Sequence, residues 1–150
     1  MSSQQQRQAI SLRGSVATCA EFFGFAVNNI LYQRAVYPPE SFQQVSKYGL
    51  PMMVTGDAAL KEYLGTVLSQ LAQWLATGHV KRLVLVVSGQ QSAAVLERWE
   101  FDVDAATGDS PAMEPKPEAN VRAEIQAVMR QITTSVSFLP VVDEPCAFDL

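Results

Sequence analysis

The sequence predicts an α+β fold in which three helices pack on an antiparallel β-sheet. Three segments, Ser15–Gln33, Asp57–Gly78 and about Glu118–Thr134, repeat apolar residues at helical spacing. Two further segments, Arg82–Ser88 and Val95–Val103, have the composition of strands and are joined by a short loop. These two strands predict a β-hairpin, and the three helices would cover its sheet.

The first predicted helix carries a wide apolar stripe, which is typical of a helix buried on most of its surface. It ends before Tyr37-Pro38-Pro39, because proline cannot continue the helical hydrogen-bond ladder. A connector from Ser41 to Met53 follows, and we expect its aromatic residues Phe42 and Tyr48 to pack on the core. The stripe comprises Val16, Cys19, Ala20, Phe23, Ala26, Val27, Ile30 and Leu31.

The second predicted helix has the clearest boundaries in the chain. Asp57 is placed to act as an N-cap, and Gly78 stands where a left-handed residue commonly ends a helix. We interpret both Trp74 and Trp99 as core or half-buried packing residues rather than ligand sites. The apolar face comprises Leu60, Tyr63, Leu64, Val67, Leu68, Leu71, Trp74 and Leu75.

The two strands of the predicted hairpin differ in pattern. Arg82–Ser88 is a nearly continuous run of β-branched and leucine residues, which indicates a central strand covered on both faces. Val95–Val103 alternates apolar and polar residues, which indicates a strand with one face in water. Glu97 is the one charged residue on the apolar side of that alternation.

The C-terminal third predicts a loop, a helix and a third strand. Residues 105–120 hold three prolines and several acidic residues without periodicity, so we expect a mobile loop. The strand predicted over Val136–Val142 contains Pro140, which places it at an edge or a bulge. The chain closes on the apolar, strand-like segment Cys146–Leu150, from which we expect that more protein once followed. The third helix faces the core with Val121, Ile125, Val128 and Ile132.

Length, charge and composition narrow the classes of function. The 150 residues fit a single domain over residues 1–150. A net charge of −4 and a pI near 4.9 argue against a general nucleic-acid surface, which needs clustered lysine and arginine. Cys19 and Cys146 lie far apart in sequence and are interpreted as reduced, buried thiols. No secretory signal or membrane span is visible, so we expect the protein to act inside the cell.

Motifs that carry catalysis or metal binding are absent from the sequence. No phosphate-binding GxxxxGK[ST] or GxGxxG and no nucleophile elbow GxSxG occurs. Catalysis by a Ser–His–Asp arrangement would depend wholly on His79, which follows Gly78 at a helix end, where a solvated histidine is common. We therefore predict no enzyme, no cofactor and no metal, and a small enzyme that uses His79 is the weaker alternative.

Eight short blocks of the sequence together resemble one family of proteins. They stand in the order and spacing of the HORMA-domain proteins of the spindle assembly checkpoint, of the mitotic arrest deficient type. The resemblance runs from about residue 8 to the end of the chain. The blocks are Ser11–Ser15, Ala20–Phe23, Ile30–Arg34, Lys47–Leu50, Val95–Trp99, Arg130–Thr133, Phe138–Pro140 and Phe148–Leu150.

The resemblance implies an adaptor in mitosis. Family members bind peptides of a kinetochore-bound coiled-coil checkpoint protein and of the activator of the anaphase-promoting complex. Each peptide adds as a strand to the sheet, and a C-terminal safety belt wraps over it. Open and closed forms of the fold can dimerise, so a population shift between two packings drives the switch. The implied locations are the nucleus, the kinetochore and the cytoplasm.

Two groups of residues are candidate partner-binding sites. The residues alone show a shallow face around Arg130 and Gln131, with small neighbours at Ala127 and Thr134, and a solvated surface is the simpler interpretation of it. The resemblance implies instead that the dimer face comprises Arg130, Gln131, Thr134 and Phe138. It also implies a peptide-binding edge strand of Val136, Ser137, Phe138, Leu139, Val141 and Val142.

One departure and one alternative accompany the resemblance. In the family the chain continues beyond the Phe148-Asp149-Leu150 block with the belt, whereas this sequence ends there. We therefore expect a fragment or a beltless form, with the N-terminal core of the domain only. The alternative function is a HORMA module of a DNA-repair or meiotic-axis complex, which would bind other peptides by the same strand addition.

Overall fold

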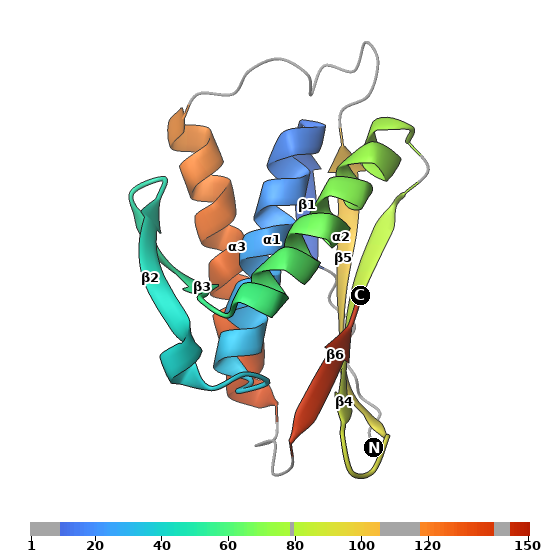
Figure 1. The fold of residues 1–150 in the computed structure, drawn as a ribbon. Helices are drawn as coiled ribbons and strands as arrows, with labels where there is room; N and C mark the ends of the chain where they lie inside the picture. Colours follow the sequence, from blue (N-terminus) through green and yellow to red (C-terminus); the bar gives the residue numbers. More distant parts are fainter. Residues whose placement is uncertain (1–9, 79, 106–117, 140–144) are drawn as a thin grey trace.

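In the part of the chain that the structure describes, three α-helices lie on one side of a four-stranded sheet, and a separate two-stranded hairpin flanks the helices (Figure 1). The computed structural model describes residues 10–78, 80–105, 118–139 and 145–150. His79, Val141 and Val142 lie outside the described residues, as does most of the predicted loop 105–120.

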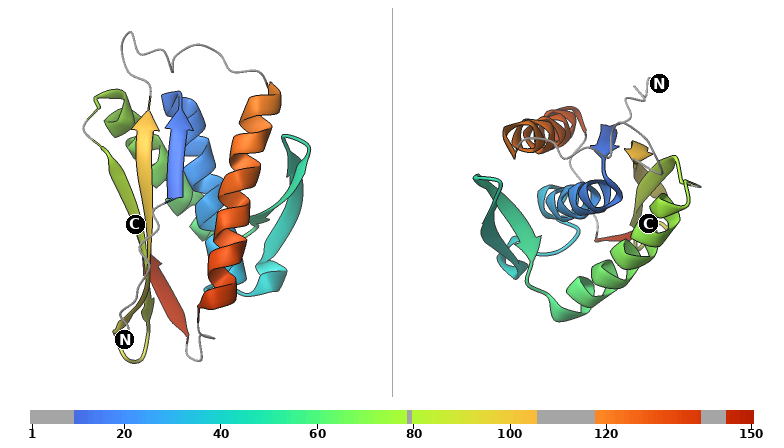
Figure 2. Two further views of the ribbon diagram at one scale, coloured as in Figure 1. Left: turned by 180° about the vertical axis from the view of Figure 1, so that it is seen from behind. Right: turned by 90° about the horizontal axis from the view of Figure 1, so that it is seen from above.

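Helix α1 (Val16–Gln33) lies at the centre of the molecule (Figure 2, right). The Ser15 hydroxyl caps it by accepting a hydrogen bond from the Thr18 backbone N–H at 3.1 Å. Its wide apolar stripe contacts α2 and α3 as well as strands of both sheets, which confirms the predicted burial. The chain then turns through Ala35, whose φ of 55° leaves the helical region.

Helix α2 (Ala58–Ala76) begins and ends where the sequence predicts. Asp57 Oδ1 accepts from the Leu60 backbone N–H at 2.9 Å, and Gly78 adopts a left-handed φ of 75°. The helix packs closely on α1 at Gly24, where an added Cβ would lie only 2.9 Å from Leu68 Cδ1 of α2. Its buried face comprises Leu60, Leu64, Leu71 and Leu75.

The larger sheet has the strand order β1-β5-β4-β6. Strands β4 (Arg82–Gly89) and β5 (Val95–Ala105) form the predicted antiparallel hairpin, and β6 (Cys146–Asp149) pairs antiparallel with β4. Strand β1 (Ile10–Gly14) was not predicted and runs parallel to β5, so the sheet is antiparallel in three strands and mixed overall.

The helices cover only one face of this sheet (Figure 2, left). The prediction that the β4 strand is covered on both faces is therefore wrong. Leu85 and Val87 are buried on the inner face, whereas the outer face holds Arg82, which pairs with Asp102 at 3.1 Å and with Glu100 at 3.2 Å. A continuous apolar run usually indicates burial on both faces, but the valines on the outer face of β4 are only half-buried.

The segment predicted as a connector forms the hairpin of β2 (Phe42–Lys47) and β3 (Leu50–Thr55). Its two-residue turn consists of Tyr48 and Gly49, with φ of 54° and 71°. Positive φ at both positions identifies a type I′ turn, which matches the twist of the flanking strands. The aromatic residues pack as expected, since Tyr48 meets the ring of Phe22 edge-on at 6.3 Å.

Helix α3 (Glu118–Phe138) extends four residues beyond its predicted end. The strand predicted over Val136–Val142 is therefore wrong where the structure describes it, because Val136, Ser137 and Phe138 form the last turn of this helix and Leu139 follows it without strand pairing. The physical reason is that the inward stripe continues through the half-buried Val136, one turn beyond the buried Ile132.

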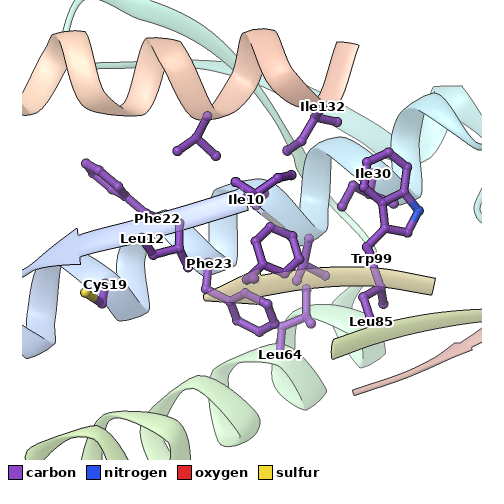
Figure 3. Close-up of a cluster of buried hydrophobic side chains, with 14 of the residues drawn as sticks. Ile10, Leu12, Cys19, Phe22, Phe23, Ile30, Leu64, Leu85, Trp99 and Ile132 are labelled. Carbon is purple, nitrogen blue, oxygen red and sulfur yellow. The ribbon is translucent and has the colours of Figure 1, made fainter. Parts of the chain in front are cut away.

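The core fills the space between α1, α2, α3 and the inner face of the sheet (Figure 3). Phe23 of α1 meets Phe101 of β5 edge-on at 5.2 Å. Trp99 is buried as predicted, but Trp74 is 53% exposed and its prediction is wrong. Cys19 and Cys146 are buried thiols, as predicted.

Candidate partner-binding surfaces

Helix α3 is fixed on the molecule by its inner face. Ile125, Val128 and Ile132 are buried against the core, and α1 provides two side-chain contacts beside them. Asn29 Nδ2 donates to Met129 Sδ at 3.4 Å, and Gln33 Nε2 donates to Thr133 Oγ1 at 3.3 Å. These polar contacts set the rotation of α3, so the residues of its other face are held in a defined position.

The outer face of α3 brings together the four residues predicted as a dimer face. Arg130, Gln131, Thr134 and Phe138 are all exposed and lie on adjacent turns. Phe138 is the most exposed large apolar residue described, at 83% of its surface. A guanidinium, an amide and an exposed aromatic ring on one helix face can provide the charge-assisted bonds and the apolar anchor of an interface.

A second surface lies at the β6 edge of the sheet. Strand β6 is the last in the order β1-β5-β4-β6 and pairs only with β4 among the described strands. Two hydrogen bonds from the β4–β5 turn fix its start, because Gln90 N donates to the Pro145 carbonyl at 2.8 Å and Gln90 Nε2 to that of Cys146 at 3.3 Å. The strand therefore offers its outer backbone edge in a fixed place.

Aromatic side chains gather beside this edge. Phe148 of β6 contacts Tyr37, which follows α1, with ring centroids 6.2 Å apart, and Tyr63 of α2 at 5.8 Å. Both contacts are edge-on, which is the preferred geometry for aromatic pairs. Burial raises the pKa of the Tyr37 phenol, and the nearby Asp57 carboxylate and Tyr63 raise it further. The phenol is therefore a neutral hydrogen-bond donor at physiological pH.

The outer side of α2 exposes two aromatic residues. Tyr63 is 41% exposed and Trp74 is 53% exposed, although both were predicted on the packed face of this helix. The sequence could have indicated this exposure. The predicted apolar stripe of α2 is wider than the row of four leucines that the core buries, so some of its residues must lie outside the core. Tyr63, Val67 and Trp74 form a second stripe at helical spacing, in which Tyr63 and Trp74 are exposed and Val67 is half-buried.

Two kinds of site are not found among the described residues. In residues 10–78, 80–105, 118–139 and 145–150, no cluster of three His, Cys, Asp or Glu side chains could hold a metal ion. None of the helices in this part of the chain is long and apolar enough to cross a membrane.

Comparison with known proteins decides the family. The model of the HORMA domain matches residues 15–150. The chain belongs to the HORMA family. Within the family it is 52% identical over 144 residues to the mitotic spindle assembly checkpoint protein MAD2A of Dictyostelium discoideum, covering 94% of this chain and 70% of that protein. It is also 47% identical over 147 residues to MAD2A of Homo sapiens, covering 97% of this chain and 72% of that protein.

A solved HORMA structure agrees with the sequence comparison. A chain in the crystal structure of a mitotic checkpoint complex superposes with a TM-score of 0.77 at 40% identity, covering 89% of this chain and 71% of that chain. MAD2B of Bos taurus is more distant, at 26% identity over 117 residues and 78% of this chain, covering 53% of that protein. The predicted HORMA fold and the MAD2-type spindle checkpoint family are thereby confirmed.

Proposed function

We propose that this HORMA protein is a non-enzymatic adaptor that captures partner peptides by strand addition in the spindle checkpoint. The expected partners are the activator of the anaphase-promoting complex and a kinetochore coiled-coil checkpoint protein. The similarity to a chain of a mitotic checkpoint complex supports the first of these. The expected locations are the kinetochore, the nucleus and the cytoplasm. MAD2-type relatives at 52% and 47% identity favour this role over DNA repair or meiotic axes.

The observation that carries the proposal is the β6 edge with its aromatic neighbours. An extended peptide can pair with the outer backbone of Cys146–Asp149, and its apolar side chains can contact the rings of Phe148 and Tyr63. This location replaces the edge strand predicted over Val136–Val142, because Val136–Phe138 are helical. Backbone hydrogen bonds would supply affinity, and the rings would supply specificity.

Peptide binding tests the proposal directly. A fluorescently labelled peptide of the anaphase-promoting complex activator is titrated with the protein and followed by fluorescence polarisation. We expect Phe148→Ala to weaken binding by about tenfold or more, because an aromatic anchor at an interface centre contributes roughly 2 kcal/mol. Phe138→Ala is the matched control, since Phe138 lies on the exposed face of α3 and should leave peptide affinity unchanged. Equal affinities for wild type and Phe148→Ala would refute the β6 site.

The outer face of α3 is proposed as the surface for dimerisation of an open with a closed copy. The exposed Arg130, Gln131, Thr134 and Phe138 support this assignment by their position on one face. The test adds this chain to a longer MAD2-type relative and follows dimer formation by size-exclusion chromatography. We expect competition by the wild-type chain and its loss in Arg130→Ala. Competition that survives Arg130→Ala would contradict the assignment.

A further inference from the structure

A side chain of the β4–β5 turn reaches the backbone of β6. Strand β6 is the last strand of its sheet and pairs with β4 over four residues. Gln90, which follows β4, donates a hydrogen bond from its side-chain Nε2 to the Cys146 carbonyl at 3.3 Å. The consequence for a bound peptide depends on which side of β6 this carbonyl faces.

Two backbone hydrogen bonds of the turn fix that direction. Gly89 N donates to the Ala94 carbonyl at 3.0 Å, toward β5. Gln90 N donates to the Pro145 carbonyl at 2.8 Å, toward β6, so these two residues form a hydrogen-bonded pair. Along an antiparallel ladder such pairs alternate with pairs that share no hydrogen bond. Cys146 comes next, opposite Gly89, so its N–H and C=O point away from β4.

Phe148 has the same orientation, two residues further along β6. It stands opposite Val87, at the next position of this alternation. Cys146 and Phe148 are therefore the residues of β6 whose backbone groups face an added strand. A peptide that pairs with this edge, in either direction, would use the carbonyls of both residues as acceptors. The Cys146 carbonyl already accepts from the Gln90 amide.

We propose that the Gln90 amide is a gate at one end of the peptide-binding edge, which a peptide must displace to pair along the whole of β6. This inference rests on the peptide site proposed at β6. A carbonyl oxygen has two lone pairs, but two donors at one oxygen repel each other, so the second donor gains less. Gln90 is exposed, so its displaced amide can bond to water. The gate therefore lowers affinity without closing the site.

The gate selects peptides by their reach along the strand. A peptide that extends to Cys146 has to break the Gln90 contact before it gains its last backbone hydrogen bond. A peptide that pairs only around Phe148 does not meet the gate and keeps its full affinity. Side chains that cover outward backbone groups also protect an edge strand from unspecific pairing, which suits a site that must remain open to solvent.

Other contacts hold β6 in place when the gate is removed. The bond from Gln90 N to the Pro145 carbonyl is a backbone bond and does not need the glutamine side chain. Phe148 is held by edge-on contacts with Tyr37 and Tyr63, which come from other segments. Gln90→Ala should therefore change the availability of one carbonyl and leave the strand where it is.

Peptide titration of the whole chain tests the gate. The labelled peptide of the anaphase-promoting complex activator is titrated with wild type and with Gln90→Ala, followed by fluorescence polarisation. Gln90→Ala should bind about threefold more tightly, because the peptide no longer breaks a neutral hydrogen bond. Gln91→Ala is the matched control, since Gln91 is the exposed neighbour on the same turn and its loss should leave the affinity unchanged.

Peptides that are each N-methylated at one amide separate the gate from a general effect on β6. Methylation removes the donor that would replace the Gln90 amide. At one peptide position the gain from Gln90→Ala should disappear, and at the others the ratio of the two affinities should persist. The proposal is overturned by a gain that no single position cancels, or by Gln90→Ala protein that binds no more tightly than wild type.

Nuclear magnetic resonance observes the contact without a peptide. Loss of the donor should move the Cys146 carbonyl ¹³C resonance to lower frequency in Gln90→Ala, and Gln91→Ala should leave it in place. A resonance that does not move would overturn the gate, whatever the peptide does. Wild type that binds no peptide would remove the peptide site and the role of the gate together. Binding that depends on Phe148 but does not improve in Gln90→Ala would remove the gate alone.

Discussion

The buried carboxylate of Glu97 shows how one residue can depart from the pattern of its strand. Its position on the apolar side of β5 is an exception in the sequence, and the structure accounts for it. Glu97 Oε2 accepts from Arg34 Nε at 2.6 Å, and Trp99 Nε1 donates to Glu97 Oε1 at 3.1 Å. The Arg34 and Glu97 side chains are only 7% and 5% exposed, so this pair joins the end of α1 to β5 inside the core.

Breaking this buried pair should destabilise the protein strongly. Glu97→Ala leaves the Arg34 guanidinium buried without its carboxylate, and such losses cost about 3–5 kcal/mol. We expect a decrease of this size in the free energy of unfolding, measured by urea denaturation. Arg98→Ala is the control, because Arg98 is 61% exposed in its pair with Glu100 and its loss should cost about 1 kcal/mol or less. Similar losses for the two variants would disprove this account.

At the scale of elements, the sequence predicts a helix better than it predicts a short strand. The caps and apolar faces of α1 and α2 are local signals, and both helices were placed correctly. β1 has only five residues, and its partner β5 lies about ninety residues further along the chain, so no local pattern identifies it. The strand predicted over Val136–Val142 is wrong at Val136–Phe138, because a β-branched residue such as Val136 also fits the inner face of a helix.

Replacing glycine by alanine should have opposite effects on stability at Gly49, in the β2–β3 turn, and at Gly65, in helix α2. Gly49→Ala should destabilise the protein by about 1–2 kcal/mol, because alanine resists a left-handed conformation such as the φ of 71° seen here. Its Cβ would also lie 3.3 Å from Arg122 Nη1. Gly65→Ala should instead stabilise α2 by about 0.5–1 kcal/mol, because no atom lies within 4 Å of the added Cβ. Thermal unfolding followed by circular dichroism measures both, and shifts of the same sign would contradict the argument.

At the scale of the whole molecule, the two proposed partner surfaces differ in how far the sequence reveals them. The α3 face consists of residues on adjacent turns of one helix, so blocks such as Arg130–Thr133 could identify it. The aromatic surface at β6 combines Tyr37, Tyr63 and Phe148 from three distant segments, and only the folded chain brings them together. A site formed by long-range contacts leaves little trace in the local sequence pattern.

The central position of α1 predicts how the molecule opens. Helix α1 contacts both sheets and the other two helices, so exposing its amides requires the whole fold to unfold. β2 lies in a two-stranded sheet and β1 at a sheet edge, so both can open locally. In hydrogen exchange measured by mass spectrometry, amides of Cys19–Ile30 should exchange slowest, and those of Gln43 and Val45, which stand at the positions of β2 that are hydrogen-bonded to β3, should exchange much faster. Destabilising the whole protein with Glu97→Ala should speed exchange in α1 far more than in β2. Equal acceleration in both elements would mean that the hairpin and α1 unfold as one unit.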